Sequence, residues 1–266
     1  MSRVYVLSAI IALLVLPAGC ATAPVNCSSP LTPRAAADCA SGVATAVFNV
    51  READRPADDK ARDNSRQLWE TLAFAQVRPG QRIADMIIGG GYFTRVFSAA
   101  VGPGGRVTAW QPAEFIAFQA SYGDSLTAVD ALPNVDAIRS PMAAPDFPAG
   151  LDLVFTAQNY HDLHLNIAPA DTASRVNAAA FAALKPGGLY VVIDHHAVAG
   201  APMTSADTVH RIDIEAVKRE VLTAGFVLDG ESDLLSNPAD PRTANVFDGS
   251  IRGRTSQFML RFRKPG

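Results

Sequence analysis

Five histidines are the side chains best suited to carry chemistry in this 266-residue sequence, and all lie after residue 160. Two follow the apolar run LDLVFTAQNY, two follow GGLYVVID, and the last precedes IEAVKREVLTAG; they are His161, His164, His195, His196 and His210. Histidine changes charge near neutral pH and is a common general base and metal ligand. If the apolar runs are parallel strands, all five histidines should converge at one edge of the sheet.

His161 and His195 are the first candidates for a general base, because each comes directly after a strand pattern. Asp162 and Asp194 stand beside them and are the expected orienting groups. We expect the two histidines to face each other across the mouth of a site. Imidazoles with Asp162 or Asp194 could instead bind a metal, but the spacing matches no zinc pattern, so no metal ligands are predicted. A third interpretation is that these side chains only end strands at a solvated rim.

A glycine triplet marks a second candidate site, in the stretch DMIIGGGYFTRVF. Gly89, Gly90 and Gly91 follow an apolar strand pattern and precede a helix that starts near Tyr92. Glycine permits positive φ there, and its missing Cβ lets backbone amides approach a ligand. Taken alone, the triplet could equally be a tight turn.

The elements that must position these residues alternate between strand and helix patterns from Gln67 onward. Such alternation indicates an α/β doubly wound domain with a mostly parallel sheet covered on both faces. The last two strand patterns are joined by a stretch without helical character, so they should pair antiparallel at one edge. The strand patterns are RIADMII, GGRVTAW, VDAIR, LDLVFTA, GGLYVVID, FVLDGESDL and SQFMLRFRK, and the helix patterns among them are YFTRVFSAAV, AEFIAFQASY, TASRVNAAAFAAL and IEAVKREVLTAG.

These motifs together resemble the class I S-adenosylmethionine-dependent methyltransferases, and more closely a bacterial group of predicted methyltransferases. The resemblance runs from RPGQRIADMIIGGGYFTRVF through LKPGGLYVVIDHH and HRIDIEAVKREVLTAGFVL to RFRKP. It implies a Rossmann-like sheet of seven strands, the last one antiparallel, and S-adenosylmethionine as cofactor. The residues that would bind this cofactor are Asp85, Gly89, Gly90, Gly91, Tyr92 and Gln111.

The sequence departs from the family pattern at three places. The first motif of the family reads acid-x-Gly-x-Gly-x-Gly, and here Ile87 stands at the first glycine. Gln111 stands where an acidic residue holds the ribose hydroxyls, and as a neutral group it loses charge-assisted strength. RSPMAAPDF lacks an acid at the adenine-contacting position. The prediction is a methyltransferase for an unknown small molecule; the alternative is an exported binding or enzyme module that has lost or changed the cofactor.

The N-terminus indicates export. Arg3 precedes an apolar run that ends in LPAGC, a layout typical of a signal peptide, and this end resembles a bacterial lipobox. Residues 1–20 are therefore a predicted signal, and a lipid on Cys20 would anchor the protein to a membrane on the periplasmic side, with plain secretion as the alternative. Residues 21–65 should form a tether and N-terminal arm, and residues 66–266 the methyltransferase-like domain. Cys27 and Cys39 are expected to form a disulfide, or else to remain free thiols.

Composition excludes some classes of function. With 48% hydrophobic and 18% charged residues, the chain can bury one good-sized core. Its formal charge of −3 and the absence of a long lysine or arginine run argue against a nucleic-acid partner. A small-molecule substrate is expected, and the sequence gives no indication of the oligomeric state.

Overall fold

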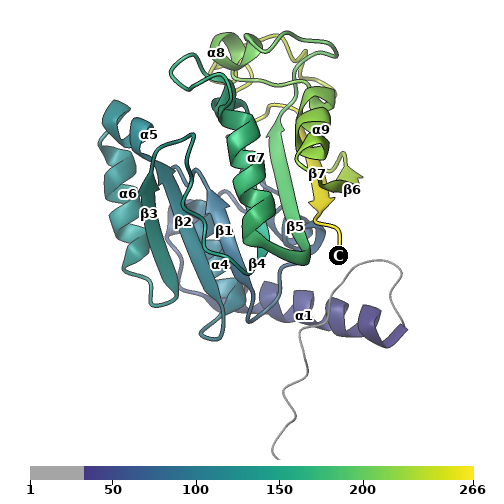
Figure 1. Ribbon diagram of the computed structural model, residues 1–266. Helices are drawn as coiled ribbons and strands as arrows, with labels where there is room; N and C mark the ends of the chain where they lie inside the picture. The colour runs from purple at the N-terminus through teal and green to yellow at the C-terminus, as the bar shows by residue number, and fades with distance from the viewer. Residues whose placement is uncertain (1–32) are drawn as a thin grey trace, which may run out of the picture.

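A seven-stranded sheet organises the chain in the computed structural model, which describes residues 33–266 (Figure 1). The strand order is β3-β2-β1-β4-β5-β7-β6. β7 runs antiparallel to both β5 and β6, and the remaining pairs are parallel. The predicted doubly wound α/β sheet is confirmed. The strands are β1 Arg82–Met86, β2 Arg106–Pro112, β3 Val135–Ser140, β4 Leu151–Ala157, β5 Leu184–His195, β6 Val227–Ser232 and β7 Gln257–Arg263.

Helices cover both faces of this sheet. Alternate residues of a strand point to opposite faces, so Val154 of β4 packs in one buried cluster and its neighbour Phe155 in the other. Figure 1 shows α7 and α9 over the near face. The helices are α1 Pro33–Glu52, α2 Ala57–Lys60, α3 Leu68–Phe74, α4 Tyr92–Val101, α5 Ala113–Phe118, α6 Ser121–Asp130, the 3₁₀ helix η1 His161–His164, α7 Thr172–Ala183, α8 Ser205–Val209 and α9 Ile214–Thr223.

The region before Gln67 differs from the tether predicted for residues 21–65. α1 is a helix of 20 residues, and Ala46 and Val50 on one of its faces are fully buried in the core with Phe97 of α4. Asn49 also donates a hydrogen bond to the carbonyl of Ala100, at 3.4 Å. The buried face of α1 consists of small side chains, so its apolar period is weak in the sequence. From residue 33 onward, the expected arm is part of the folded domain.

The signal and lipobox predicted for residues 1–20 lie outside the described residues, as does Cys27. Cys39 is disulfide-bonded, which agrees with a disulfide at this position, and its pairing with Cys27 stays a prediction. Over residues 33–266, the structure contains no helix with the length and hydropathy needed to cross a membrane.

Candidate functional site

The glycine loop joins β1 to α4, and its three glycines serve different purposes. Gly91 is the residue before α4 and has φ 76°; a Cβ on it would lie 2.6 Å from Cγ1 of Val129. Gly89 also has positive φ, at 54°, but no atom lies within 4 Å of its would-be Cβ. Gly90 has neither a positive φ nor a neighbour within that distance. Gly91 is therefore required by packing, whereas the face of the loop at Gly89 and Gly90 is open.

Ile87 occupies the position where the family pattern has its first glycine, and it keeps a backbone conformation suited to glycine. Its φ is 55°, in the left-handed region that β-branched residues rarely adopt. The side chain is 2% exposed and packs in the core. Asn159 fixes the strained residue by donating from Nδ2 to its carbonyl at 2.8 Å. The loop thus makes a turn that glycine would favour, although Ile87 carries a buried, β-branched side chain at this position.

Gln111 lies near the end of β2, directly beside the loop. Its Oε1 accepts a hydrogen bond from the backbone N–H of Gly89 at 3.0 Å. Its Nε2 is buried, and no hydrogen-bond partner for it exists among residues 33–266. A buried polar atom without a partner is costly, and such an atom next to an open loop indicates a place for a ligand acceptor.

A cavity of about 100 Å³ adjoins the loop. Arg66 helps to line it, with its guanidinium 4.7 Å from the ring centre of Tyr92 and 5.2 Å from that of Phe93. Burial, together with the nearby charge of Arg62, lowers the pKa of Arg66. Neither arginine was among the sequence candidates: Arg62 lies in the segment predicted as a tether, and Arg66 lies at the first position of the predicted domain, before its first helix pattern. The lining residues are Arg62, Arg66, Asp85, Ile87, Ile88, Gly89, Gly90, Tyr92, Phe93, Ala157 and Asn159.

Asp85 and Tyr92, two of the predicted cofactor residues, also line this cavity. Tyr92 donates its hydroxyl to Oδ1 of Asp63 at 2.7 Å, and Thr94 donates to Oδ2 of Asp85 at 2.6 Å. Burial raises the pKa of Asp85 to about 7, against the opposing effects of the Thr94 hydrogen bond and the charge of Arg66. The carboxyl therefore titrates near neutral pH.

The second candidate site is built around His161, at the start of η1, and Asp194, at the end of β5. Nδ1 of His161 lies 2.9 Å from Oδ1 and 3.1 Å from Oδ2 of Asp194. Asp194 is fully buried and also accepts the backbone N–H groups of His161, at 2.6 Å, and His195, at 2.7 Å. On the other side of the ring, Nε2 of His161 lies 3.3 Å from Oδ1 of Asp162. His161 is thus placed between two carboxylates.

These neighbours decide the charge of each group. Burial by itself would lower the pKa of His161, but Asp194 and Asp162 outweigh it and raise this pKa to about 9. Burial raises the pKa of Asp162 to about 6, although His161 opposes that shift. Burial lowers the pKa of His195 to about 4, and its Nδ1 lies 2.8 Å from the hydroxyl of Thr255. At neutral pH, His161 is therefore protonated and His195 is neutral.

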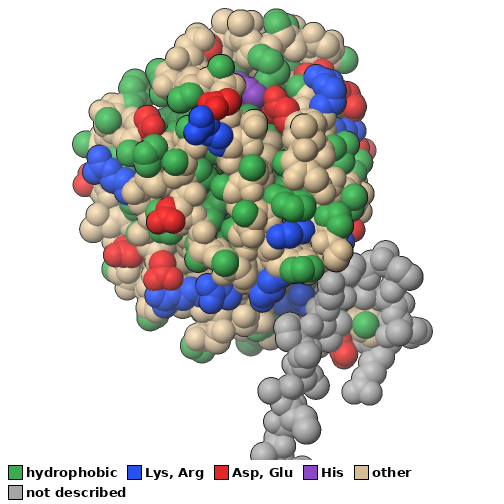
Figure 2. Space-filling model, in the orientation of Figure 1, with side chains coloured by type: hydrophobic (Ala, Val, Ile, Leu, Met, Phe, Trp, Pro, Cys, Tyr) green, Lys and Arg blue, Asp and Glu red, His purple; other side chains and the backbone are tan. Residues whose placement is uncertain are grey.

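Three of the five histidines come together. The ring centre of His161 lies 6.0 Å from that of His195 and 5.5 Å from that of His210. His161 and His195 are 4% and 8% exposed, so they are buried neighbours rather than residues facing across an open mouth. On the face drawn in Figure 2, histidine is visible only as a small purple patch.

The prediction that all five histidines converge is wrong for two of them. His164 turns to α9, where its Nε2 lies 3.1 Å from Oε2 of Glu220. His196 packs its ring against Phe258 of β7, with 5.4 Å between ring centres. The reason is that consecutive residues leave a strand or a 3₁₀ helix in different directions, so only some of them point toward the sheet edge.

The same fold occurs in solved methyltransferases. A SAM-dependent methyltransferase from Aquifex aeolicus is 16% identical, with a TM-score of 0.51 over 81% of this chain and 96% of the other. One from Mesorhizobium loti is 16% identical, with a TM-score of 0.51 over 73% and 96% of the two chains. The N-methyltransferase NodS from Bradyrhizobium japonicum is 13% identical, with a TM-score of 0.52 over 77% and 97%.

No protein-family model and no curated protein matches the sequence. The structural similarity shows the class I methyltransferase fold, and at such low identity it shows the fold alone. Function must therefore be argued from the two sites, which lie at the same carboxyl edge of the sheet and are joined by Asn159, two residues before His161.

Proposed function

We propose that the protein is an S-adenosylmethionine-dependent methyltransferase that acts on a small molecule. The observation that carries this proposal is the buried, unpartnered Nε2 of Gln111, a residue whose Oε1 accepts the backbone N–H of Gly89 in the glycine loop. In class I folds, ligands bind at this edge of the sheet, beyond the carboxyl ends of the strands. When bound, the cofactor supplies a methyl group activated by its sulfonium.

The side chains around the loop fit such a cofactor. Nε2 of Gln111 is a donor without a partner among residues 33–266 and matches a ribose hydroxyl, and Arg66 is a half-buried cation suited to the carboxylate at the other end of the molecule. The space is smaller than the ligand requires: the cavity measures about 100 Å³, whereas sites for such ligands span roughly 300–1,000 Å³. Binding therefore requires the Arg66 side chain to move off Tyr92.

The histidine cluster provides the polar side of this site, where we place the acceptor. His161 is held by Asp194, as the predicted orienting role requires. Its pKa of about 9 means that it can act as a base only after losing a proton. His195 is neutral at pH 7, so of the two it is the one with a free base form, and Asp162 completes the polar group.

The alternative is a module that has kept the fold and lost or changed the cofactor. Ile87 favours it, because this residue has a side chain where the family pattern has a glycine. The cavity of about 100 Å³ favours it as well, because it is smaller than the cofactor requires. The further predictions of export, periplasmic location and a lipid on Cys20 rest on the sequence of residues 1–20, and we retain them as proposals.

A matched pair of glycine variants tests the function. Gly90 and Gly104 both lack a positive φ, and no atom lies within 4 Å of either would-be Cβ, so both positions accept a Cβ without a clash. We expect the purified full chain to bind S-adenosylhomocysteine in calorimetric titration, Gly104→Val to bind equally, and Gly90→Val to lose binding. Gly91→Val is unsuitable, since its side chain would collide with Val129.

Two results would count against the methyltransferase proposal. One is the absence of heat for both S-adenosylmethionine and S-adenosylhomocysteine with folded wild-type protein, which would favour the module without this cofactor. The other is unchanged affinity in Gly90→Val, which would place any bound nucleoside away from the glycine loop.

A further inference from the structure

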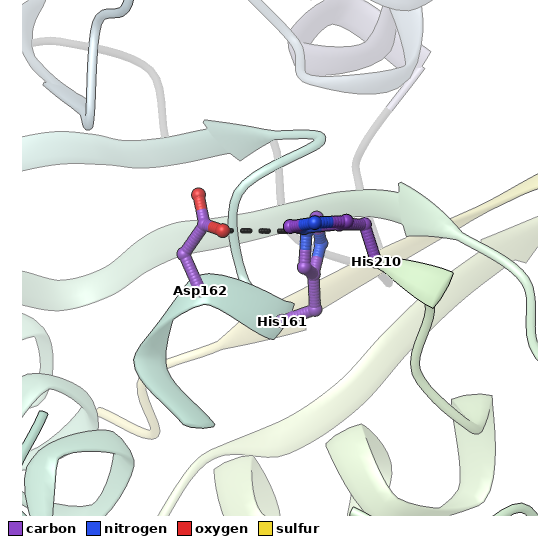
Figure 3. A group of neighbouring side chains, drawn as sticks. All are labelled: His161, Asp162 and His210. Carbon is purple, nitrogen blue, oxygen red and sulfur yellow. Dashed lines mark ion pairs between the residues drawn. The ribbon is translucent and has the colours of Figure 1, made fainter. Parts of the chain in front are cut away.

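A group of three side chains near the end of β4 has the composition of a metal site (Figure 3). His161 and Asp162 come from η1, and His210 comes from the residue that follows α8. One nitrogen or oxygen of each lies within 4.8 Å of those of the other two. Figure 3 shows the two rings together, with the carboxylate of Asp162 directed toward them.

The orientation of His161 is fixed from behind by Asp194. Because Nδ1 is engaged with this carboxylate at 2.9 Å, Nε2 is the atom that faces Asp162. Histidines that bind metals commonly donate their other ring nitrogen to a carboxylate, which fixes the tautomer and makes the ligand more basic. Asp194 is fully buried and is held by two backbone N–H groups, so it is rigid enough for this task.

The third residue, His210, is held in a strained conformation. Its φ is 53°, and such left-handed backbone in a residue other than glycine costs on the order of 1–3 kcal/mol. The following residue, Arg211, is fully buried and anchors the segment through Asp240 at 2.8 Å and the carbonyls of His196 and Ala244. The strained residue is thus the one that supplies the third side chain of the group, the ring of His210.

We propose that His161, Asp162 and His210 bind a divalent transition-metal ion, with Asp194 as the carboxylate that orients His161. Two imidazole nitrogens and one carboxylate oxygen suit Zn²⁺, Mn²⁺ or Fe²⁺ and disfavour Ca²⁺ and Mg²⁺, which take oxygen ligands. A dipositive ion would also balance the two carboxylates that flank His161. Three protein ligands leave at least one position open for water or for a polar substrate atom.

The proposal does not depend on the cofactor, and its test contains none. The full chain is stripped with a chelator and titrated with Zn²⁺ or Mn²⁺ at pH 7 by calorimetry, with metal content and melting temperature as second readouts. We expect about one ion per chain and a higher melting temperature with metal.

Four variants test the assignment. His210→Gly removes a ligand and suits the positive φ, and Asp162→Asn removes the carboxylate charge; both should lower affinity at least about 100-fold. Asp194→Asn should lower it about 10–100-fold, as is usual for outer carboxylates. His164→Gln is the matched control, since this half-buried histidine pairs with Glu220 outside the group, and it should bind like the wild type.

Stoichiometric binding that is lost in His210→Gly and kept in His164→Gln supports the site, provided that both variants show wild-type circular dichroism without metal. If His210→Gly fails to fold, Asp162→Asn decides by the same comparison. The proposal is overturned if the folded wild type binds neither ion stoichiometrically, or if the ligand variants bind like the control. His161 would then be a buried cation between two carboxylates and nothing more.

Discussion

Replacing Asp85 with asparagine should change how the stability of the protein depends on pH. The folded pKa of this carboxyl is about 7, against 3.8 for an unperturbed aspartate, so the folded state binds the proton more readily than the unfolded state. Stability associated with Asp85 is therefore fully present below about pH 4 and is lost as the pH rises toward 7. At about 1.36 kcal/mol per pKa unit, the full penalty is roughly 4 kcal/mol.

The assay is urea denaturation of the wild type and Asp85→Asn between pH 5 and pH 8. A linkage calculation with these two pKa values gives a change of roughly 2–3 kcal/mol in the difference between their free energies of unfolding, the variant gaining relative stability as pH rises. The absolute difference also contains a constant, because the new amide N–H₂ needs a partner that the carboxyl did not, so the pH dependence is the decisive quantity.

Asp124→Asn, on the exposed face of α6, controls for the removal of one negative charge. A difference between the wild type and Asp85→Asn that stays flat from pH 5 to 8, or that moves in the opposite direction, would refute the reasoning. It would mean that Arg66 pairs with Asp85 strongly enough to cancel the cost of burial.

Three further predictions follow from particular contacts. Ile87→Gly should relieve roughly 1–2 kcal/mol of left-handed strain but lose the larger stabilisation from a buried side chain, so urea denaturation should show a net loss of about 1–3 kcal/mol. The affinity for S-adenosylhomocysteine should rise, and a fall in affinity in the folded variant would contradict this. Arg211→Met should lower the free energy of unfolding by about 3–5 kcal/mol, because Asp240 is left buried without its partner. The double variant Arg211→Met with Asp240→Asn should recover part of this loss, and equal stability of the single variant and the wild type would argue against a structural ion pair. Val50→Ala on α1 should cost about 2 kcal/mol, and Phe48→Ala on its exposed face close to none; equal effects would mean that α1 does not pack as described.

The sheet could be predicted from the sequence because its signals are local. The bounds proposed for α4 and β4, residues 92–101 and 151–157, agree with the structure, since long apolar runs bounded by glycine or proline leave few alternatives. The pattern AEFIAFQASY divides into α5 and the start of α6, with a break at Gln119. That break depends on packing that no local period reports.

α1 could not be recognised in the same way. Its sequence, PRAAADCASGVATAVFNVRE, buries alanine and valine while Phe48, its largest apolar side chain, is 62% exposed. A hydrophobic pattern therefore indicates the wrong face or none. The consequence extends to the site, because the chain after α1 is what brings Arg66 onto Tyr92.

The candidate sites were predictable in part, for a physical reason. Residues at or shortly after the ends of parallel strands, such as Asp194 and His161, must lie at the carboxyl edge, and the structure brings them together. Which of the neighbouring side chains point toward His161 depends on side-chain direction: the ring of His210 lies against His161, whereas His164 pairs with Glu220. The conformation of Ile87 is the opposite of what its β-branched side chain predicts, and no pattern in the sequence indicated the left-handed φ.

The connection through Asn159 explains how Ile87 holds a backbone conformation that glycine favours. Nδ2 of Asn159 donates to the carbonyls of both Ile87 and Ala157 at 2.8 Å, which fixes the left-handed residue against the end of β4. The strain is thus offset by a hydrogen bond and by burial of the isoleucine side chain. Shape and space at this loop are therefore separate properties: the backbone has the turn, whereas the cavity beside it, which Arg66 helps to line, measures only about 100 Å³. The first property supports a cofactor site and the second opposes it, and because Arg66 is a side chain that can turn away, while the backbone is fixed at both ends, the shape is the stronger argument.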